Sequence, residues 1–133
     1  MLQGHEHAYA RMTAMDGEGH PTTPVYTVSH CSPKNYRIRF SDRFDRFGIS
    51  SRYYQTVEFR EDTLVLSAYE VYGHTLYDSL HIVKQDGASR IEDLGQGIPE
   101  YLEYTPRPRK KKDLKFARRI QAYRQRRGRA TAR

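Results

Sequence analysis

The sequence contains very little cysteine and no long apolar run. Cys31 is the only cysteine among 133 residues, which excludes an internal disulfide and a zinc cluster built from cysteines. No apolar stretch approaches the roughly 18 residues that a membrane span needs, and the N-terminus lacks the regions of a signal peptide. We therefore expect one soluble domain with a modest core, because the chain is too short for most two-domain enzymes.

Acidic residues are nearly absent from the end of the chain. Residues 106–133 hold 13 Lys and Arg but one acidic residue, whereas residues 1–105 hold 10 basic and 15 acidic residues. The net charge of +7 therefore comes entirely from the tail. Because Pro106 and Pro108 interrupt regular structure just before the charge run, we predict a body over 1–105 and a basic helical or disordered tail over 106–133.

Apolar residues recur in this tail at helical spacing. Phe116, Ile120 and Tyr123 lie at i, i+4 and i+7, which predicts a basic amphipathic helix. Such a helix could lie on an anionic membrane, bind nucleic acid or pack against the acidic body, and we favour packing on the body or fraying. From Arg124 onward there is too little apolar surface, so we expect disorder there.

The body has the pattern of a mainly antiparallel β structure, so the predicted fold class is α+β. The last three of its strand-like runs should form a meander, with apolar residues such as Leu80 and Ile82 on one face. Between the first two runs, Phe40, Phe44 and Phe47 recur at helical spacing, which predicts a loop with one docked helical turn ending near Gly48. The strand-like runs are 23–29, 53–59, 63–72 and 75–84.

The stretch "GHEHAYARM" at residues 4–12 is the most suggestive for chemistry. On an extended backbone His5 and His7 would project to the same side, and Gly4 would let a preceding strand end there. Imidazole is a good ligand for zinc, iron and manganese. By itself, however, a His-x-His pair is weak evidence for a metal site. The remaining histidines are more typical of solvated or core positions: His20, His30, His74 and His81.

The order of the motifs along the chain strengthens the evidence for a metal site at His5 and His7. "LQGHEHAYAR", then "PVYTVSH", and later "YYQTVEF" and "TLVLSAYEVYGHTLYDSLHIVK" together resemble the C-terminal part of the calcineurin-like metallophosphoesterases, most closely the purple acid phosphatase group. The resemblance covers about residues 2–84 and includes Asp78 ahead of an aliphatic strand ending. It implies a partial sheet of a metallophosphoesterase β-sandwich, and an exported or periplasmic location is possible by the same resemblance.

The resemblance also implies roles for individual residues. His5 and His7 would each give a nitrogen to a centre of two divalent or trivalent metal ions (Fe, Zn or Mn), and neither would be a general base. The implied reaction is hydrolysis of a phosphate ester, in which metal ions activate water and neutralise phosphoryl charge. Arg11 could meet the substrate phosphate, although a surface salt bridge is the more ordinary role for one arginine.

The upstream ligand motifs of that family are missing here. The chain has no Gly-Asp or Gly-Asn dipeptide, and three residues precede Gly4. We therefore expect the C-terminal fragment of a longer protein or a truncated reading frame, which the upstream half of its own domain would complete and which is inactive alone. Its apolar-faced strands would lack a partner layer, which predicts self-association into homo-oligomers through exposed strands.

Two other functions stay open. The chain could be a non-catalytic β module whose basic tail binds nucleic acid or an anionic surface, with the histidine pair incidental. It could also be a mononuclear metal-binding protein that recruits ligands from a second copy of the chain.

Overall fold

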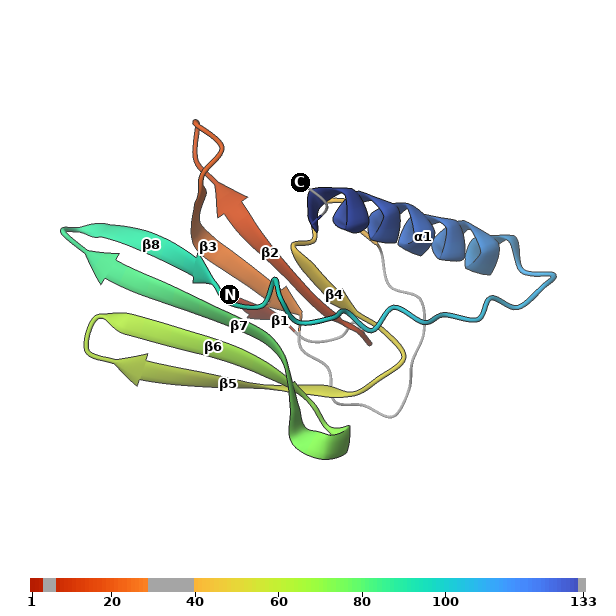
Figure 1. Ribbon diagram of the computed structural model, residues 1–133, viewed down its shortest axis with the longest axis horizontal. Coiled ribbons are helices and arrows are strands. Elements are labelled where there is room, and N and C mark those ends of the chain that lie inside the picture. Colours follow the sequence, from red (N-terminus) through yellow and green to blue (C-terminus); the bar gives the residue numbers. More distant parts are fainter. Residues whose placement is uncertain (4–6, 29–39, 132–133) are drawn as a thin grey trace.

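The chain folds into two β-sheets and one long helix (Figure 1). The structure, a computed structural model, describes residues 1–3, 7–28 and 40–131, with side chains to residue 129. A short 3-10 helix, Tyr72–His74, precedes β7. The strands and helix are β1 Leu2–Gln3, β2 Tyr9–Met15, β3 Pro21–Val28, β4 Arg46–Gly48, β5 Tyr53–Arg60, β6 Thr63–Glu70, β7 Thr75–Gln85, β8 Ala88–Asp93 and α1 Lys111–Thr131.

The two sheets and the helix form three layers. The first sheet has the order β1-β3-β2-β4, with β1 parallel to β3 and the other pairs antiparallel. The second sheet, β5-β6-β7-β8, is entirely antiparallel. Side chains alternate along β2, so that Tyr9 packs toward the second sheet while Ala8 and Ala10 pack toward α1. The predicted α+β class with mainly antiparallel strands is confirmed.

The predicted meander forms the second sheet. Its strands β5, β6 and β7 agree with the predicted runs to within two residues, and β8 adds a fourth strand that the sequence pattern did not reveal. The β7–β8 turn uses Asp86 and Gly87, both at positive φ, which suits a two-residue hairpin loop. The turn predicted at residues 73–74 is present within the 3-10 helix, where Gly73 has a φ of 82°.

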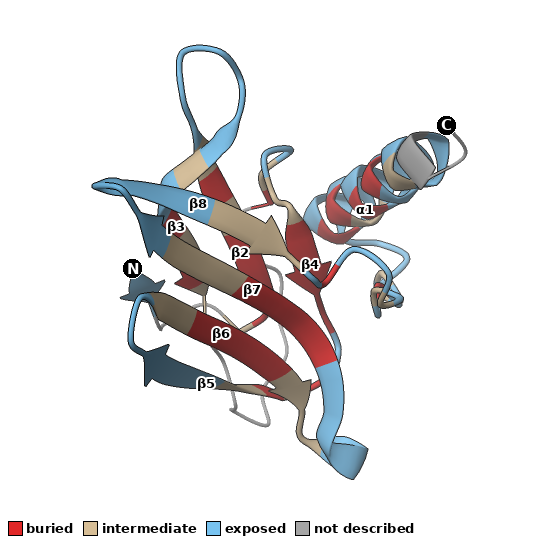
Figure 2. Cartoon of the chain, turned by 60° about the vertical axis from the view of Figure 1, so that its left-hand side comes forward, coloured by how far each residue is buried: buried red, intermediate tan, exposed pale blue. Residues whose placement is uncertain are grey.

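The expectation that the meander lacks a partner layer is wrong. Val25 of β3 packs against Leu66 and Leu80, so the first sheet covers the inner face of the second (Figure 2). Coverage ends toward the tip of edge strand β5, where Phe59 is 80% exposed although Tyr53 at the other end of β5 is fully buried. Self-association through this edge stays a prediction.

The phenylalanine segment docks as predicted but not as a helix. Residues 42–43 form a turn, and Phe47 lies in β4, which pairs with β2. Phe40 and Phe44 each lie within 5.6 Å of the Phe47 ring, centroid to centroid. Gly48 is required by the close packing there, because a Cβ at this position would lie 2.7 Å from the Tyr53 hydroxyl. Pairing with β2 therefore overrides the helical spacing of the three rings.

The tail folds onto the body, and it is helical as far as Thr131, so the disorder expected from Arg124 onward is wrong for residues 124–131. Phe116, Ile120 and Tyr123 are buried in one cluster with residues of β2 and β4. The helix continues to Thr131, and two ion pairs hold its last turns, Arg126 with Asp42 and Arg127 with Glu100. Among the residues that the structure describes, no helix is long and apolar enough to cross a membrane.

Candidate functional site

In the sequence, the histidine pair falls between β1 and β2. β1 ends at Gln3, immediately before Gly4, where the sequence predicted a strand end. His7 is partly buried and lies two residues before β2, whose first residues Tyr9 and Ala10 are buried. His5 falls outside the described residues, so the structure does not give the distance between the two imidazoles.

The described residues do not by themselves fit a centre of two metal ions. Within residues 1–3, 7–28 and 40–129, no group of three or more His, Cys, Asp or Glu side chains is placed to hold one ion. His7 has a suitable donor chemistry, but one imidazole is far from a complete ligand set. We therefore derive no reaction step through metal ions from these residues.

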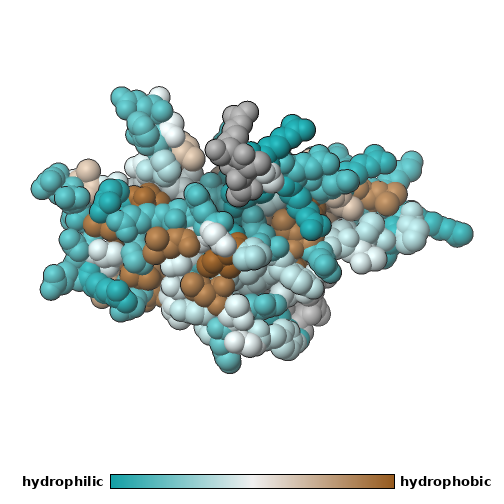
Figure 3. Space-filling view, in the orientation of Figure 1, coloured by the Kyte–Doolittle hydropathy of each residue, from teal (hydrophilic) through white to brown (hydrophobic). Residues whose placement is uncertain are grey.

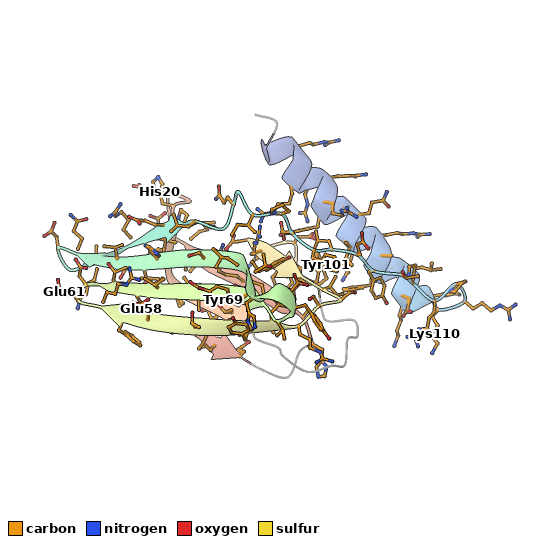
Figure 4. All side chains as sticks on the ribbon, turned by 60° about the horizontal axis from the view of Figure 1, so that its bottom comes forward. His20, Glu58, Glu61, Tyr69, Tyr101 and Lys110 are labelled. Atoms are coloured by element: carbon orange, nitrogen blue, oxygen red, sulfur yellow. The ribbon has the colours of Figure 1, made fainter. Side chains whose placement is uncertain are left out.

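The other described histidines lie at ordinary positions. His20 is 68% exposed in the β2–β3 loop, with its Nδ1 atom 3.4 Å from an Asp16 carboxylate oxygen (Figure 4). The Nδ1 atom of His74 lies 3.1 Å from the Tyr54 hydroxyl, and His81 lies beside Glu92. His30 falls outside the described residues. The sequence interpretation gave these histidines solvated or core positions; His20 and His74 are exposed, and His81 is partly buried.

Arg11 lies between the two sheets and is 1% exposed. Its Nε atom donates to Asp78 Oδ2 at 2.7 Å, and its Nη2 atom donates to Asp78 Oδ1 at 3.2 Å and to Asp93 Oδ2 at 2.8 Å. The Tyr9 hydroxyl donates to Asp78 Oδ2 at 2.7 Å. A buried arginine thus receives a two-point contact from one carboxylate and a third contact from another.

Local sequence explains how this network assembles. Alternation along β2 places both Tyr9 and Arg11 on the side that faces the second sheet. A bulge in β7 interrupts its register just before Asp78. Gly95 lies against the Asp78 carboxylate, and a Cβ at Gly95 would overlap Oδ1 of Asp78. A larger residue at position 95 would therefore displace the carboxylate.

The network changes the acid–base behaviour of its members. Desolvation lowers the pKa of Arg11, but hydrogen bonds and charge from Asp78 and Asp93 outweigh it and raise this pKa above its ordinary value. Burial, followed by the negative charge of Asp78, raises the pKa of Tyr9 well above its usual value. Both residues therefore keep their protons, so the network is a fixed ion pair with a phenol donor.

The expectation of a surface salt bridge for Arg11 is wrong, since the ion pairs are buried. Its contact with a substrate phosphate stays a prediction, while the observed geometry turns the guanidinium toward Asp78, Asp93 and Asp45. Sequence reasoning did not identify Asp78 as the partner of Arg11. The available signal was an aspartate between Leu76 and Leu80 on a strand, because a charge in an apolar run requires a partner when buried.

The solvent side of α1 is a second candidate surface. Hydrophilic side chains cover much of the visible part of this helix (Figure 3), and long side chains project from it into solvent from Lys110 onward (Figure 4). We call residues 107–110, which precede α1, its lead-in. The exposed lysines and arginines on α1 and this lead-in are Arg107, Arg109, Lys110, Lys111, Lys112, Lys115, Arg118, Arg119, Arg124, Arg126 and Arg129.

Comparisons with protein-family models, with curated proteins and with solved structures found no match for this chain.

Proposed function

We propose that these 133 residues form the C-terminal part of a binuclear metal-dependent phosphoesterase that hydrolyses phosphate esters. The observation that carries this proposal is the position of Gly4-His5-Glu6-His7 between a strand that ends at Gln3 and the buried strand β2. An antiparallel partner, β3, and a closing antiparallel meander follow in the order of the resemblance to purple acid phosphatases.

The packing of β2 suits a ligand that must be held in place. Ala8 and Tyr9 are fully buried, so the backbone directly after His7 is fixed on both faces. Metal ligands held by a packed strand lose little freedom when the ion binds, which favours affinity. When bound, the ions (Fe, Zn or Mn) would supply an activated water and neutralise phosphoryl charge.

The remaining ligands would come from the upstream half of the domain. Among the described residues no group of three or more His, Cys, Asp or Glu side chains could hold an ion, so the proposal assigns only His5 and His7 to the centre. We accordingly expect this chain alone to bind metal weakly and to leave phosphate esters intact.

Cobalt binding to the 133-residue chain, purified without a histidine tag, tests the ligand assignment. Co²⁺ titration followed by its visible absorption should give a signal that is lost in the double variant His5→Ala/His7→Ala. The matched control is His20→Ala/His81→Ala, which removes two histidines elsewhere and should leave the signal unchanged. Circular dichroism of each variant verifies that it folds.

Two results would contradict the proposal. Equal cobalt binding by the chain and the His5/His7 variant would remove the metal role of the pair. Hydrolysis of p-nitrophenyl phosphate by this chain, unaffected by the same double variant, would place any phosphatase site elsewhere.

A further inference from the structure

Nine cationic side chains on α1 and its lead-in make no ion pair within the part of the chain that the structure describes. The acidic residue of this region, Asp113, is buried and bonded to Arg107, so it does not neutralise the exposed face. Arg126 and Arg127 pair with acids of the body. The nine are Arg109, Lys110, Lys111, Lys112, Lys115, Arg118, Arg119, Arg124 and Arg129.

Helical geometry arranges several of these charges in one line. Lys111, Lys115, Arg118 and Arg129 follow at i, i+4, i+7 and i+18, which places them on the same face of α1. At 1.5 Å per residue this line is about 27 Å long. We call these four residues the basic stripe. Because the helix is docked on the body by Phe116, Ile120 and Tyr123, the stripe is held straight before any partner binds.

The buried apolar side of α1 argues against a membrane as the partner. A helix that lies in a membrane interface inserts its apolar face among the lipids, and electrostatic attraction adds to that burial. Here Phe116, Ile120 and Tyr123 are at most 5% exposed, because they fill the core beside β2 and β4. Apart from Leu114 and Ala122, the side chains that α1 exposes to solvent are polar or charged, which suits a partner that presents rows of phosphates.

We propose that the basic stripe binds the sugar–phosphate backbone of double-stranded nucleic acid without reading its sequence. A duplex carries one negative charge per roughly 1.7 Å of axis, and lysines and arginines that neutralise phosphates release condensed counterions. Phosphate contacts hold a protein on a duplex but carry no sequence information. Residues 1–105 have a net charge of −5, so repulsion directs the duplex to the helix and away from the sheets. The stripe is separate from the histidine pair, and this inference does not depend on the proposed phosphoesterase role.

Fluorescence anisotropy with labelled 20-base-pair duplexes, one of DNA and one of RNA, tests this on the full chain. We expect binding that weakens steeply with salt. Lys111→Gln/Lys115→Gln/Arg118→Gln removes three contacts, and the slope of log K against log salt should become shallower by about 2.7, at 0.9 per phosphate. Glutamine is a good helix former, so α1 should persist.

The matched control removes the same charge from the second sheet. Arg60→Gln/Lys84→Gln/Arg90→Gln changes three exposed residues of β5, β7 and β8, and should leave the salt slope unchanged. Equal losses in both triple variants would show that net charge, and not the stripe, determines binding, which would overturn the proposal. Absence of binding to both duplexes at 50 mM salt would also overturn it.

A parallel binding measurement with lipid vesicles distinguishes a nucleic-acid duplex from an anionic membrane as the partner. Vesicles of phosphatidylserine and phosphatidylcholine should bind the chain more weakly than the duplexes at the same ionic strength. Tighter binding to vesicles, lost in the Lys111/Lys115/Arg118 variant, would assign the stripe to a lipid surface and overturn the assignment to nucleic acid. Binding to DNA and RNA duplexes with similar affinity is expected, because the contacts are to the shared backbone chemistry.

Discussion

The two faces of β2 are packed in opposite ways. Toward the second sheet, Tyr9 and Arg11 meet Asp78 in a network of buried ion pairs and hydrogen bonds. Toward α1, Ala8 and Ala10 lie against aromatic rings, most of which pack edge to face. One of these contacts joins Phe40 and Phe47 with centroids 5.1 Å apart and planes at 89°. One strand thus supplies a polar interface on one side and an apolar interface on the other.

The polar and the apolar interface of β2 should contribute to the fold in different ways. Aromatic rings tolerate small shifts, because their burial energy depends mainly on area removed from water. The Arg11–Asp78 pair does not, because both groups are costly to bury when separated. We infer that the polar face fixes how β2 aligns with β7, while the apolar face supplies most of the burial energy that holds α1.

The largest expected effect follows from breaking the polar face. Asp78→Ala leaves the Arg11 guanidinium with Asp93 as its remaining close partner and removes the acceptor of the Tyr9 hydroxyl. We expect the free energy of unfolding to fall by about 4 kcal/mol, within the range for a broken buried pair. Urea denaturation measures it. Asp42→Ala is the control, because its pair with Arg126 is exposed and should contribute less than about 1 kcal/mol. Equal losses in the two variants would contradict the role given to the network.

A smaller loss is expected on the apolar face. Phe116→Ala removes a ring that contacts Phe40 and Tyr104 and should cost about 3 kcal/mol, within the range for a buried phenylalanine. Leu114→Ala, at an exposed position on the same helix, is the control and should change stability little. Denaturation monitored by circular dichroism measures both. If Phe116→Ala were as mild as Leu114→Ala, the docking of α1 would contribute little to stability.

Sequence reasoning predicted local patterns better than contacts across the fold. The meander and the apolar stripe of α1 follow from periods of 2 and 3.6, so both were predictable. The partner layer over the meander and the pairing of Arg11 with Asp78 were not, because both join residues far apart in the sequence, 67 positions in the case of Arg11 and Asp78. Phe47 was assigned to a helical turn because its spacing from Phe40 and Phe44 is helical, yet pairing with β2 places it in a strand. For the candidate metal site, the assignment of His5 rests on the sequence alone. The structure adds that one strand ends before the motif and another begins after it.

The two faces also differ in how strongly a tyrosine hydroxyl is needed. Tyr9 donates to Asp78 at 2.7 Å, and Tyr123 donates to Glu100 at 2.8 Å. Tyr9→Phe should cost about 2 kcal/mol, since the hydrogen bond is buried and its acceptor is charged. Tyr123→Phe should cost about 1 kcal/mol, because the hydrogen bond to Glu100 is only partly buried. Unfolding in urea at pH 7 compares the pair, and a reversed order would contradict the distinction between the faces.

Alkaline pH probes the same two phenols. Burial, followed by a neighbouring carboxylate, raises the pKa of both Tyr9 and Tyr123, whereas in the unfolded chain each titrates near pH 10. Because the folded state holds these protons more tightly, their stabilisation is complete below about pH 10 and is lost as the pH rises toward the folded pKa. Above about pH 10, each phenol should therefore steepen the fall of unfolding free energy by about 1.4 kcal/mol per pH unit.

Denaturation from pH 8 to 11.5 should show this fall, and either Tyr→Phe variant should make it shallower by one such step. A pH profile unchanged in both variants would mean that neither hydroxyl stays protonated in the folded protein, and the fixed hydrogen bonds on both faces of β2 would have to be abandoned.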